Sequence, residues 1–100
     1  MAYKIELHPE AIKEMKESYL WYEQRSENLG KRFISAVDKR LDEIADHPER
    51  YSKRKVNYRE ARTEIFPYII IYEILEKEKI VFVSYIFHAR RNPKLKYKRK

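Results

Sequence analysis

The feature of this sequence that most limits its fold is a change of hydrophobic period near residue 56. Before that point apolar residues recur every three or four positions, and after it they alternate or run continuously. The first period is typical of amphipathic helices and the second of β-strands. The sequence therefore predicts an α+β domain, with its helices in the first half and most of its strands in the second.

Two amphipathic helices are predicted before the change of period. A short alternating strand over residues 2–7 precedes them and ends at His8-Pro9. The first helix is predicted to begin there, because proline suits the first turn of a helix. A break at residues 26–28 separates the helices, and the second ends near His47-Pro48. The apolar stripes are Ile12, Met15, Tyr19 and Tyr22 in the first helix, and Leu29, Phe33, Val37, Leu41 and Ile44 in the second. Tyr19, Trp21 and Tyr22 are predicted to be core residues rather than a stacking surface.

Three strands are predicted after the change of period. Residues 56–65 alternate, while residues 68–75 and 80–87 are apolar on both faces and flank a charged turn at residues 76–78. Short links between successive strands favour antiparallel pairing. The predicted order is β-α-α-β-β-β, an antiparallel sheet with a helical hairpin packed on one face and the first strand at an edge. Since the helices cover one face only, we expect the other apolar face to remain open for a protein partner.

The positive charge of the chain is concentrated at one end. The 23 Lys and Arg and 16 Asp and Glu give a net charge of +7, and seven bases without an acid lie between Arg90 and Lys100. We therefore divide the chain into a single domain at residues 1–89 and a basic tail at residues 90–100. Such a tail attracts nucleic acid or an acidic partner; alternatively, it only aids solubility.

Several classes of function have no support in the sequence. There is no cysteine and a single glycine, which argues against a thiolate nucleophile, a cysteine-based zinc site and a glycine-rich nucleotide loop. The three histidines lie on separate predicted elements, so we expect no metal and no cofactor. No leader segment and no apolar run near twenty residues is present, so we expect a cytoplasmic protein without membrane contact.

One constellation could carry chemistry, the segment Phe87-His88-Ala89-Arg90-Arg91-Asn92-Pro93. His88 could act as general acid or base and the two arginines could stabilise a phosphate, as RNA cleavage requires. Arg62 on the neighbouring strand is a further catalytic candidate. The alternative is that His88 merely ends the strand and the arginines pair with Glu60 or Glu64. The residues predicted to bind a target or nucleic acid are Arg90, Arg91, Lys94, Lys96, Tyr97 and Lys98, with Tyr97 as a stacking face.

Five segments occur in order over nearly the whole chain. They are Trp21-Tyr22, Leu29-Gly30-Lys31-Arg32-Phe33, His47-Pro48-Glu49-Arg50-Tyr51, Phe66-Pro67-Tyr68-Ile69-Ile70-Ile71-Tyr72, and the His88 segment given above. With the β-α-α-β-β-β order, they resemble the RelE/ParE toxins of type II toxin–antitoxin systems. The resemblance implies a cognate antitoxin whose C-terminal segment wraps the toxin, for which Tyr68, Ile70, Tyr72, Phe82 and Ile86 are the expected binding residues.

The resemblance leaves two main activities open. RelE-like members are metal-independent, ribosome-dependent nucleases that cut messenger RNA, with an arginine three positions before a tyrosine on the central strand. Aligned on Tyr72, that position holds Ile69. The Phe-Pro-Tyr sequence is more similar to the ParE and plasmid-stabilisation branch, whose members inhibit DNA gyrase. The resemblance therefore favours a ParE-like toxin that binds gyrase and is not an enzyme; the alternatives are a RelE-like endonuclease acting on ribosome and mRNA, or an inactive orphan member.

Overall fold

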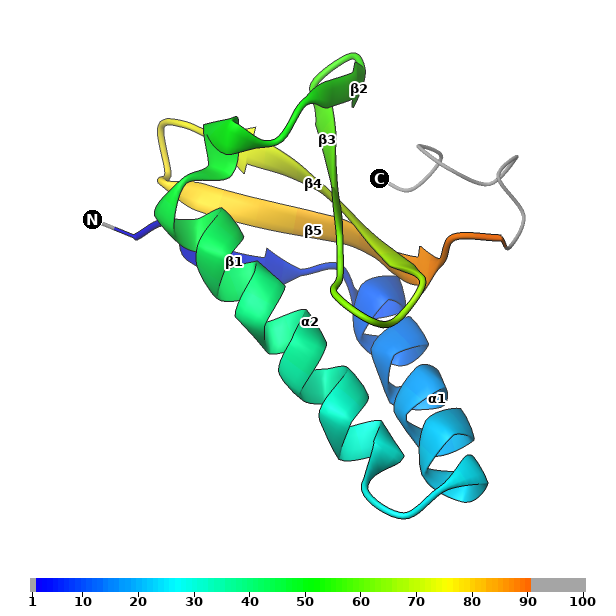
Figure 1. Ribbon diagram of the computed structural model, residues 1–100. Helices are drawn as coiled ribbons and strands as arrows, with labels where there is room; N and C mark the ends of the chain where they lie inside the picture. Colours follow the sequence, from blue (N-terminus) through cyan, green and yellow to red (C-terminus); the bar gives the residue numbers. More distant parts are fainter. Residues whose placement is uncertain (1, 91–100) are drawn as a thin grey trace.

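The computed structural model describes residues 2–90 of the chain. A helical hairpin packs on one face of a five-stranded sheet, which confirms the predicted α+β class (Figure 1). The strands are ordered β1-β5-β4-β3-β2 across the sheet. Along the chain the elements are β1 (Lys4–Leu7), α1 (Pro9–Arg25), α2 (Leu29–Asp46), the 3-10 helix η1 (Pro48–Arg50), β2 (Lys53–Lys55), β3 (Tyr58–Arg62), β4 (Tyr68–Leu75) and β5 (Ile80–His88).

The sheet differs from the predicted one in two strands. β1 lies at an edge, as predicted, but it pairs with β5 in parallel, so the sheet is mixed rather than antiparallel. A short link fixes the relative direction only of the two strands that it joins. β1 and β5 are neighbours in the sheet, but the chain between them is long enough for either direction. Of the predicted strand at residues 56–65, only Tyr58–Arg62 forms a strand, β3. Val56 and Asn57 form a turn instead, and this turn joins β3 to the preceding strand β2.

The main core lies between the helices and the sheet. Phe33, Val37 and Ile44 of α2 are fully buried against Ile70 and Tyr72 of β4. The helical stripe and the strand alternation each provide one wall of this core, as the sequence predicts.

Residues near the helix ends fix the hairpin. The Glu23 carboxylate accepts hydrogen bonds from the backbone N–H groups of Asn28 and Gly30, at 3.1 and 2.9 Å. These are donors that the first turn of α2 cannot satisfy internally. At the other end of α2, the Tyr72 hydroxyl donates to the carbonyl of Pro48 at 2.6 Å, which ties the central strand to η1.

A β-bulge in β5 decides which side chains face the helices. Tyr72 pairs with Val83 but Ile71 pairs with Tyr85, so Ser84 is an extra residue on β5. Val83 and Ile86 consequently both lie in the main core, whereas Tyr85 lies in a second cluster on the other face. A strand without a bulge would place Val83 and Tyr85 on the same face, so the extra residue Ser84 is what separates them.

The second face of the sheet is not the open apolar surface that the sequence predicts. Ile69, Ile71, Tyr85 and Phe87 form a cluster there, and each is less than 9% exposed. The rings of Tyr85 and Phe87 lie 5.8 Å apart, and Tyr58 and Ala89 pack against the cluster. The cluster therefore leaves little apolar surface exposed for a partner, although a large exposed apolar patch is what the sequence led us to expect.

Candidate functional site

A cavity of about 320 Å³ lies where β5 ends beside the last turns of α1. It brings together side chains from both halves of the sequence. Its lining residues are Trp21, Tyr22, Tyr68, His88 and Arg90, and we call it the His88 cavity.

Aromatic rings form a fixed wall of the His88 cavity. The Tyr22 ring meets the Trp21 ring edge to face with centroids 5.1 Å apart, and it meets Phe66 at 5.0 Å. The Tyr68 hydroxyl donates to the Ser18 Oγ at 2.9 Å in the protein interior. Because these contacts hold Tyr22 and Tyr68 in place, the wall does not need to be ordered when a ligand arrives.

Trp21 is the exposed part of this wall. Its side chain is 47% exposed, and the guanidinium of Arg25 lies 4.1 Å from its ring centroid. The prediction that Trp21 is a core residue is therefore wrong, whereas Tyr22 packs against the main core as predicted. In the sequence, Trp21 lies beside the apolar stripe of α1 rather than on it, and this offset is the signal that indicates its exposure.

His88 is oriented by its own strand end. Its Nδ1 accepts a hydrogen bond from the backbone N–H of Arg90 at 3.1 Å, and the ring meets the Tyr68 ring edge to face at 5.5 Å. The N–H of Ala89 donates to the carbonyl of Pro67 at 2.8 Å, which anchors this turn. A neutral imidazole with Nδ1 as acceptor carries its proton on Nε2, so His88 has one donor to offer to a ligand.

The His88 cavity can hold a planar or aromatic group against Trp21 and an anionic group near Arg90. Aromatic stacking and a guanidinium are features of nucleobase and phosphate recognition, and they also suit an aromatic side chain beside a carboxylate. His88 can donate or accept a proton there.

The structure brings together some predicted site residues and separates others. His88 and Arg90 share the cavity. Arg62 pairs with Ile69, which faces the second cluster, whereas His88 pairs with Tyr68 on the helix-covered face. Arg62 and His88 therefore lie on opposite faces of the sheet. The other predicted residues, Arg91, Lys94, Lys96, Tyr97 and Lys98, lie outside the described residues.

The residues predicted to bind an antitoxin are mostly inaccessible. Tyr68, Ile70, Tyr72 and Ile86 are at most 3% exposed in the main core, so they do not form the exposed surface that the prediction needed. The physical reason is that β4 turns these side chains toward α2, and the Ser84 bulge does the same for Ile86. Phe82 is only partly buried and can contribute to a surface.

Neither metal ligation nor membrane spanning finds support in residues 2–90. No group of three or more histidine and carboxylate side chains there could hold a metal ion. None of the described helices has the length and apolar character needed to cross a membrane.

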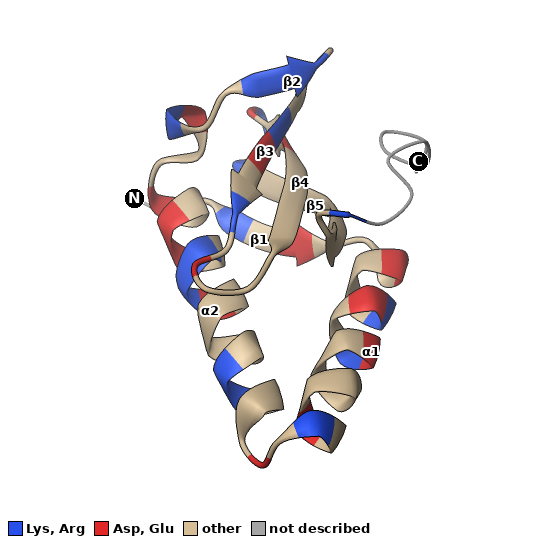
Figure 2. Cartoon of the chain, turned by 45° about the vertical axis from the view of Figure 1, so that its right-hand side comes forward, with Lys and Arg blue, Asp and Glu red and all other residues tan. Residues whose placement is uncertain are grey.

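Within residues 2–90, basic side chains also cluster away from Arg90. β2 carries Lys53, Arg54 and Lys55 in succession, all exposed, and forms a basic edge of the sheet (Figure 2). The basic character of the molecule therefore extends beyond the predicted tail.

A family model described as the ParE toxin of the type II toxin–antitoxin system parDE matches residues 5–93. A search of curated proteins gives no match. Among solved structures, Escherichia coli RelE with two arginine-to-alanine substitutions, in complex with a RelB peptide, is similar at 20% identity and a TM-score of 0.69, covering 95% of this chain and 90% of that one.

Two further solved structures have the same fold. The intact Escherichia coli RelBE complex is similar at 19% identity and a TM-score of 0.65, covering 90% of this chain and 100% of that one. The archaeal RelE–RelB complex from Pyrococcus horikoshii gives 16% identity and a TM-score of 0.54, covering 92% and 100%. At these identities the likeness shows the RelE-like fold, which agrees with the observed architecture.

Proposed function

Since the chain belongs to the ParE toxin family of type II toxin–antitoxin systems, within the RelE/ParE superfamily, we propose that this toxin acts by binding DNA gyrase and that a cognate antitoxin neutralises it. In this proposal the toxin is a binding protein that acts in the cytoplasm. The His88 cavity and the basic residues from Arg90 onward are the surface that meets the target.

The observation that carries the gyrase proposal concerns residues 2–90, in which the cationic side chains do not converge on His88 as RNA cleavage would require. The position where the RelE-like members place an arginine holds Ile69, which is 2% exposed in the second cluster. Arg62 lies on the sheet face opposite His88. Within residues 2–90, Arg90 is therefore the only arginine or lysine that lines the cavity, whereas a pentacoordinate phosphate gains most from several convergent donors.

The antitoxin partner is supported by the family and by the solved neighbours. Two of those neighbours are RelE–RelB complexes and a third holds a RelB peptide. An antitoxin with acidic residues would complement the seven bases at residues 90–100.

A ribosome-dependent mRNA endonuclease is the second candidate, because His88, Arg90 and Trp21 share one cavity. This arrangement offers a proton donor, a cation and a stacking surface, which together suit an RNA nucleotide. Induced expression in a bacterial host separates the two candidates. We expect relaxed plasmid DNA and intact transcripts, and purified protein should inhibit supercoiling by purified gyrase.

Cleavage of ribosome-bound mRNA with normal supercoiling would overturn the gyrase proposal in favour of the endonuclease. Normal growth, with neither effect, would support an inactive orphan member.

Replacing the two arginines that follow His88 in the sequence tests the proposed site directly. We expect Arg90→Ala combined with Arg91→Ala to reduce growth inhibition at least tenfold, because the target-binding surface loses two adjacent cations. Arg62→Ala is the matched control on the opposite sheet face, and it should leave growth inhibition unchanged. Equal effects of the two variants, at equal protein levels, would show that the target surface does not lie at the His88 cavity.

A further inference from the structure

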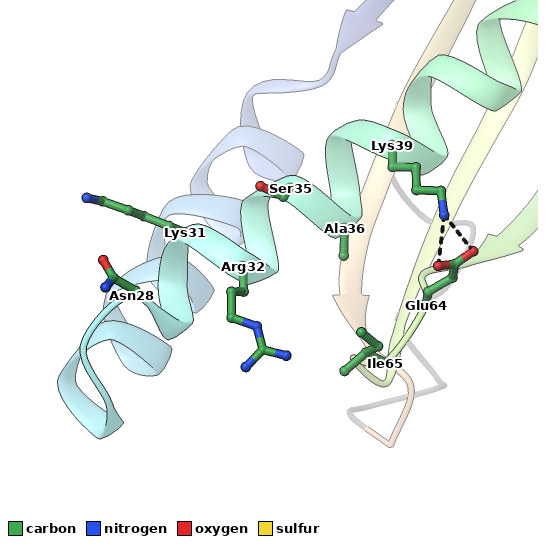
Figure 3. Close-up of a pocket in the computed structure, with 8 residues that line it drawn as sticks. All are labelled: Asn28, Lys31, Arg32, Ser35, Ala36, Lys39, Glu64 and Ile65. Carbon is green, nitrogen blue, oxygen red and sulfur yellow. Dashed lines mark hydrogen bonds and ion pairs between the residues drawn. The ribbon is translucent and has the colours of Figure 1, made fainter.

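A second hollow, of about 400 Å³, lies between α2 and the loop that joins β3 to β4 (Figure 3). Five of its residues recur at three- or four-residue spacing along α2, and the loop closes the other side. We call this hollow the α2 groove. Its lining residues are Asn28, Lys31, Arg32, Ser35, Ala36, Lys39, Glu64 and Ile65.

The α2 groove carries an excess of positive charge. Neither Lys31 nor Arg32 has an ion-pair partner within residues 2–90, and both are exposed. Lys39 donates to both oxygens of Glu64, at 3.0 and 3.1 Å, and Arg40 lies 3.9 Å from the same carboxylate. The hydrogen bond from Lys39 lowers the pKa of Glu64, so this carboxylate stays charged and offsets only part of the positive charge.

The loop holds an isoleucine outward at an energetic cost. The Ile65 side chain is 82% exposed, and its backbone φ is 71°, in the left-handed region that β-branched residues avoid. The Thr63 hydroxyl donates to the Phe66 carbonyl at 2.7 Å, and the N–H of Phe66 donates to the Glu64 carbonyl at 2.7 Å. Phe66 is buried, so this tight loop fixes Ile65 at the mouth of the groove.

We propose that the α2 groove binds an acidic, extended segment of a partner protein, which places one apolar side chain against Ile65 and Ala36. The segment's carboxylates would meet Lys31 and Arg32. The stripe from Asn28 to Lys39 is about 17 Å long at the helical rise of about 1.5 Å per residue, a span of about five extended residues. This inference is independent of whether the toxin acts on gyrase or on mRNA.

A protein segment fits this groove better than a nucleic acid does. Glu64 presents a carboxylate at one end, which repels a phosphate backbone, whereas a peptide can place its own carboxylates beside Lys31 and Arg32 only. The exposed Ile65 and the Ala36 methyl provide an apolar contact, which rewards a side chain more than a sugar–phosphate chain.

The test uses the full chain and a displayed library of random twelve-residue peptides. We expect selected peptides to share several Asp or Glu around one Leu, Ile, Val or Phe. A fluorescein-labelled peptide of the selected sequence would then be titrated against the chain by anisotropy. Arg32→Glu should weaken its binding at least tenfold, and the matched control Arg54→Glu, on the exposed strand β2, should change it less than twofold.

A second variant separates binding from folding. Ile65→Asn puts a residue that tolerates positive φ at the strained position, so it should raise the unfolding midpoint while weakening peptide binding at least fivefold. A residue with only a structural role would not move the two readouts in opposite directions.

Three outcomes would overturn the proposal: no enrichment of acidic peptides, equal weakening by Arg32→Glu and Arg54→Glu, or unchanged peptide binding in Ile65→Asn. A single-stranded RNA twelve-mer is titrated in parallel. If the RNA binds through Arg32 and the selected peptide does not, the groove is a nucleic-acid site and the proposal is wrong.

Discussion

Gly30 allows the two helices of the hairpin to approach each other at the start of α2. A Cβ built at Gly30 would lie 2.6 Å from the backbone oxygen of Tyr19 and 2.9 Å from the Glu23 carboxylate that caps α2. Because the nearest atom belongs to the backbone, α1 and α2 would have to separate to accept a side chain. The single glycine of the sequence therefore marks a helix contact rather than a turn.

We expect Gly30→Ala to lower the free energy of unfolding by about 2 kcal/mol, as overpacked contacts generally do. In an exposed helix the same change stabilises by up to about 1 kcal/mol, so the sign itself is diagnostic. Urea denaturation provides the measurement, with Ser35→Ala on the exposed side of α2 as the control. A stabilised Gly30→Ala variant would contradict the close helix contact.

Tyr72 is expected to make the fold less stable at alkaline pH. Burial raises the pKa of its hydroxyl, an effect that the nearby Arg59 partly offsets, and the folded chain retains this proton when the unfolded chain has lost it. The stability from this group is therefore complete below the unfolded pKa of about 10 and is lost as pH rises above it.

Tyr72→Phe removes both this titration and the hydrogen bond to Pro48. We expect it to cost about 1 kcal/mol at pH 7, because the buried Pro48 carbonyl is left unpaired. Between pH 9 and pH 11 the wild type should lose about 1 kcal/mol more than the variant. Equal losses in urea denaturation at the two pH values would show that Tyr72 does not carry the alkaline dependence.

At the scale of elements, periodicity predicts the helices and the central strands because burial of one face controls both. It fails where backbone geometry changes without a change in hydrophobicity. Ser84 is small and follows a continuous apolar run, so nothing marks it as a bulge, yet it decides that His88 faces the helices. Val56 reads as a strand residue, but it occupies a turn with a φ of 51°. The pattern of apolar residues indicates which positions are buried, but it does not indicate where the backbone adopts a positive φ.

The β2–β3 hairpin offers a test of this reading. Val56 is 77% exposed and adopts the left-handed conformation, which costs a non-glycine residue roughly 1–2 kcal/mol. Since asparagine tolerates this conformation, we expect Val56→Asn to raise the free energy of unfolding by about 1 kcal/mol. Val56→Thr keeps the β-branch and should give no comparable gain in the same denaturation experiment. A destabilised Val56→Asn would mean that the valine side chain makes a contact worth more than its strain.

At the scale of the whole molecule, the sequence identified the site only in part. His88 and Arg90 could be named because they adjoin within one segment, and they do share a cavity. Trp21 could not be assigned to that cavity, since its place depends on how α1 crosses the end of β5. Arg62 was placed with them by strand adjacency, but adjacency does not reveal which face a side chain occupies, and the pairing puts it on the opposite face.

The distribution of charge over the whole chain leads to a prediction about its tail. Residues 94–100 contain five bases and no acid, and removing them lowers the formal net charge from +7 to +2. Residues 2–90 contain both hydrophobic clusters described above, so we expect the truncated chain to fold while binding its target more weakly. Its affinity should also fall less steeply between 50 and 200 mM salt, since fewer charges are screened.

Binding of the truncated and full chains to immobilised gyrase at both salt concentrations measures this effect, with circular dichroism as the folding control. Gln24→Ala in the otherwise full chain, an exposed neutral change on α1, should leave affinity and salt dependence unaltered. An unfolded truncation would show that residues 94–100 belong to a core. A folded truncation with the full salt dependence would instead move the electrostatic contact to other basic residues, of which those on β2 are the first to replace.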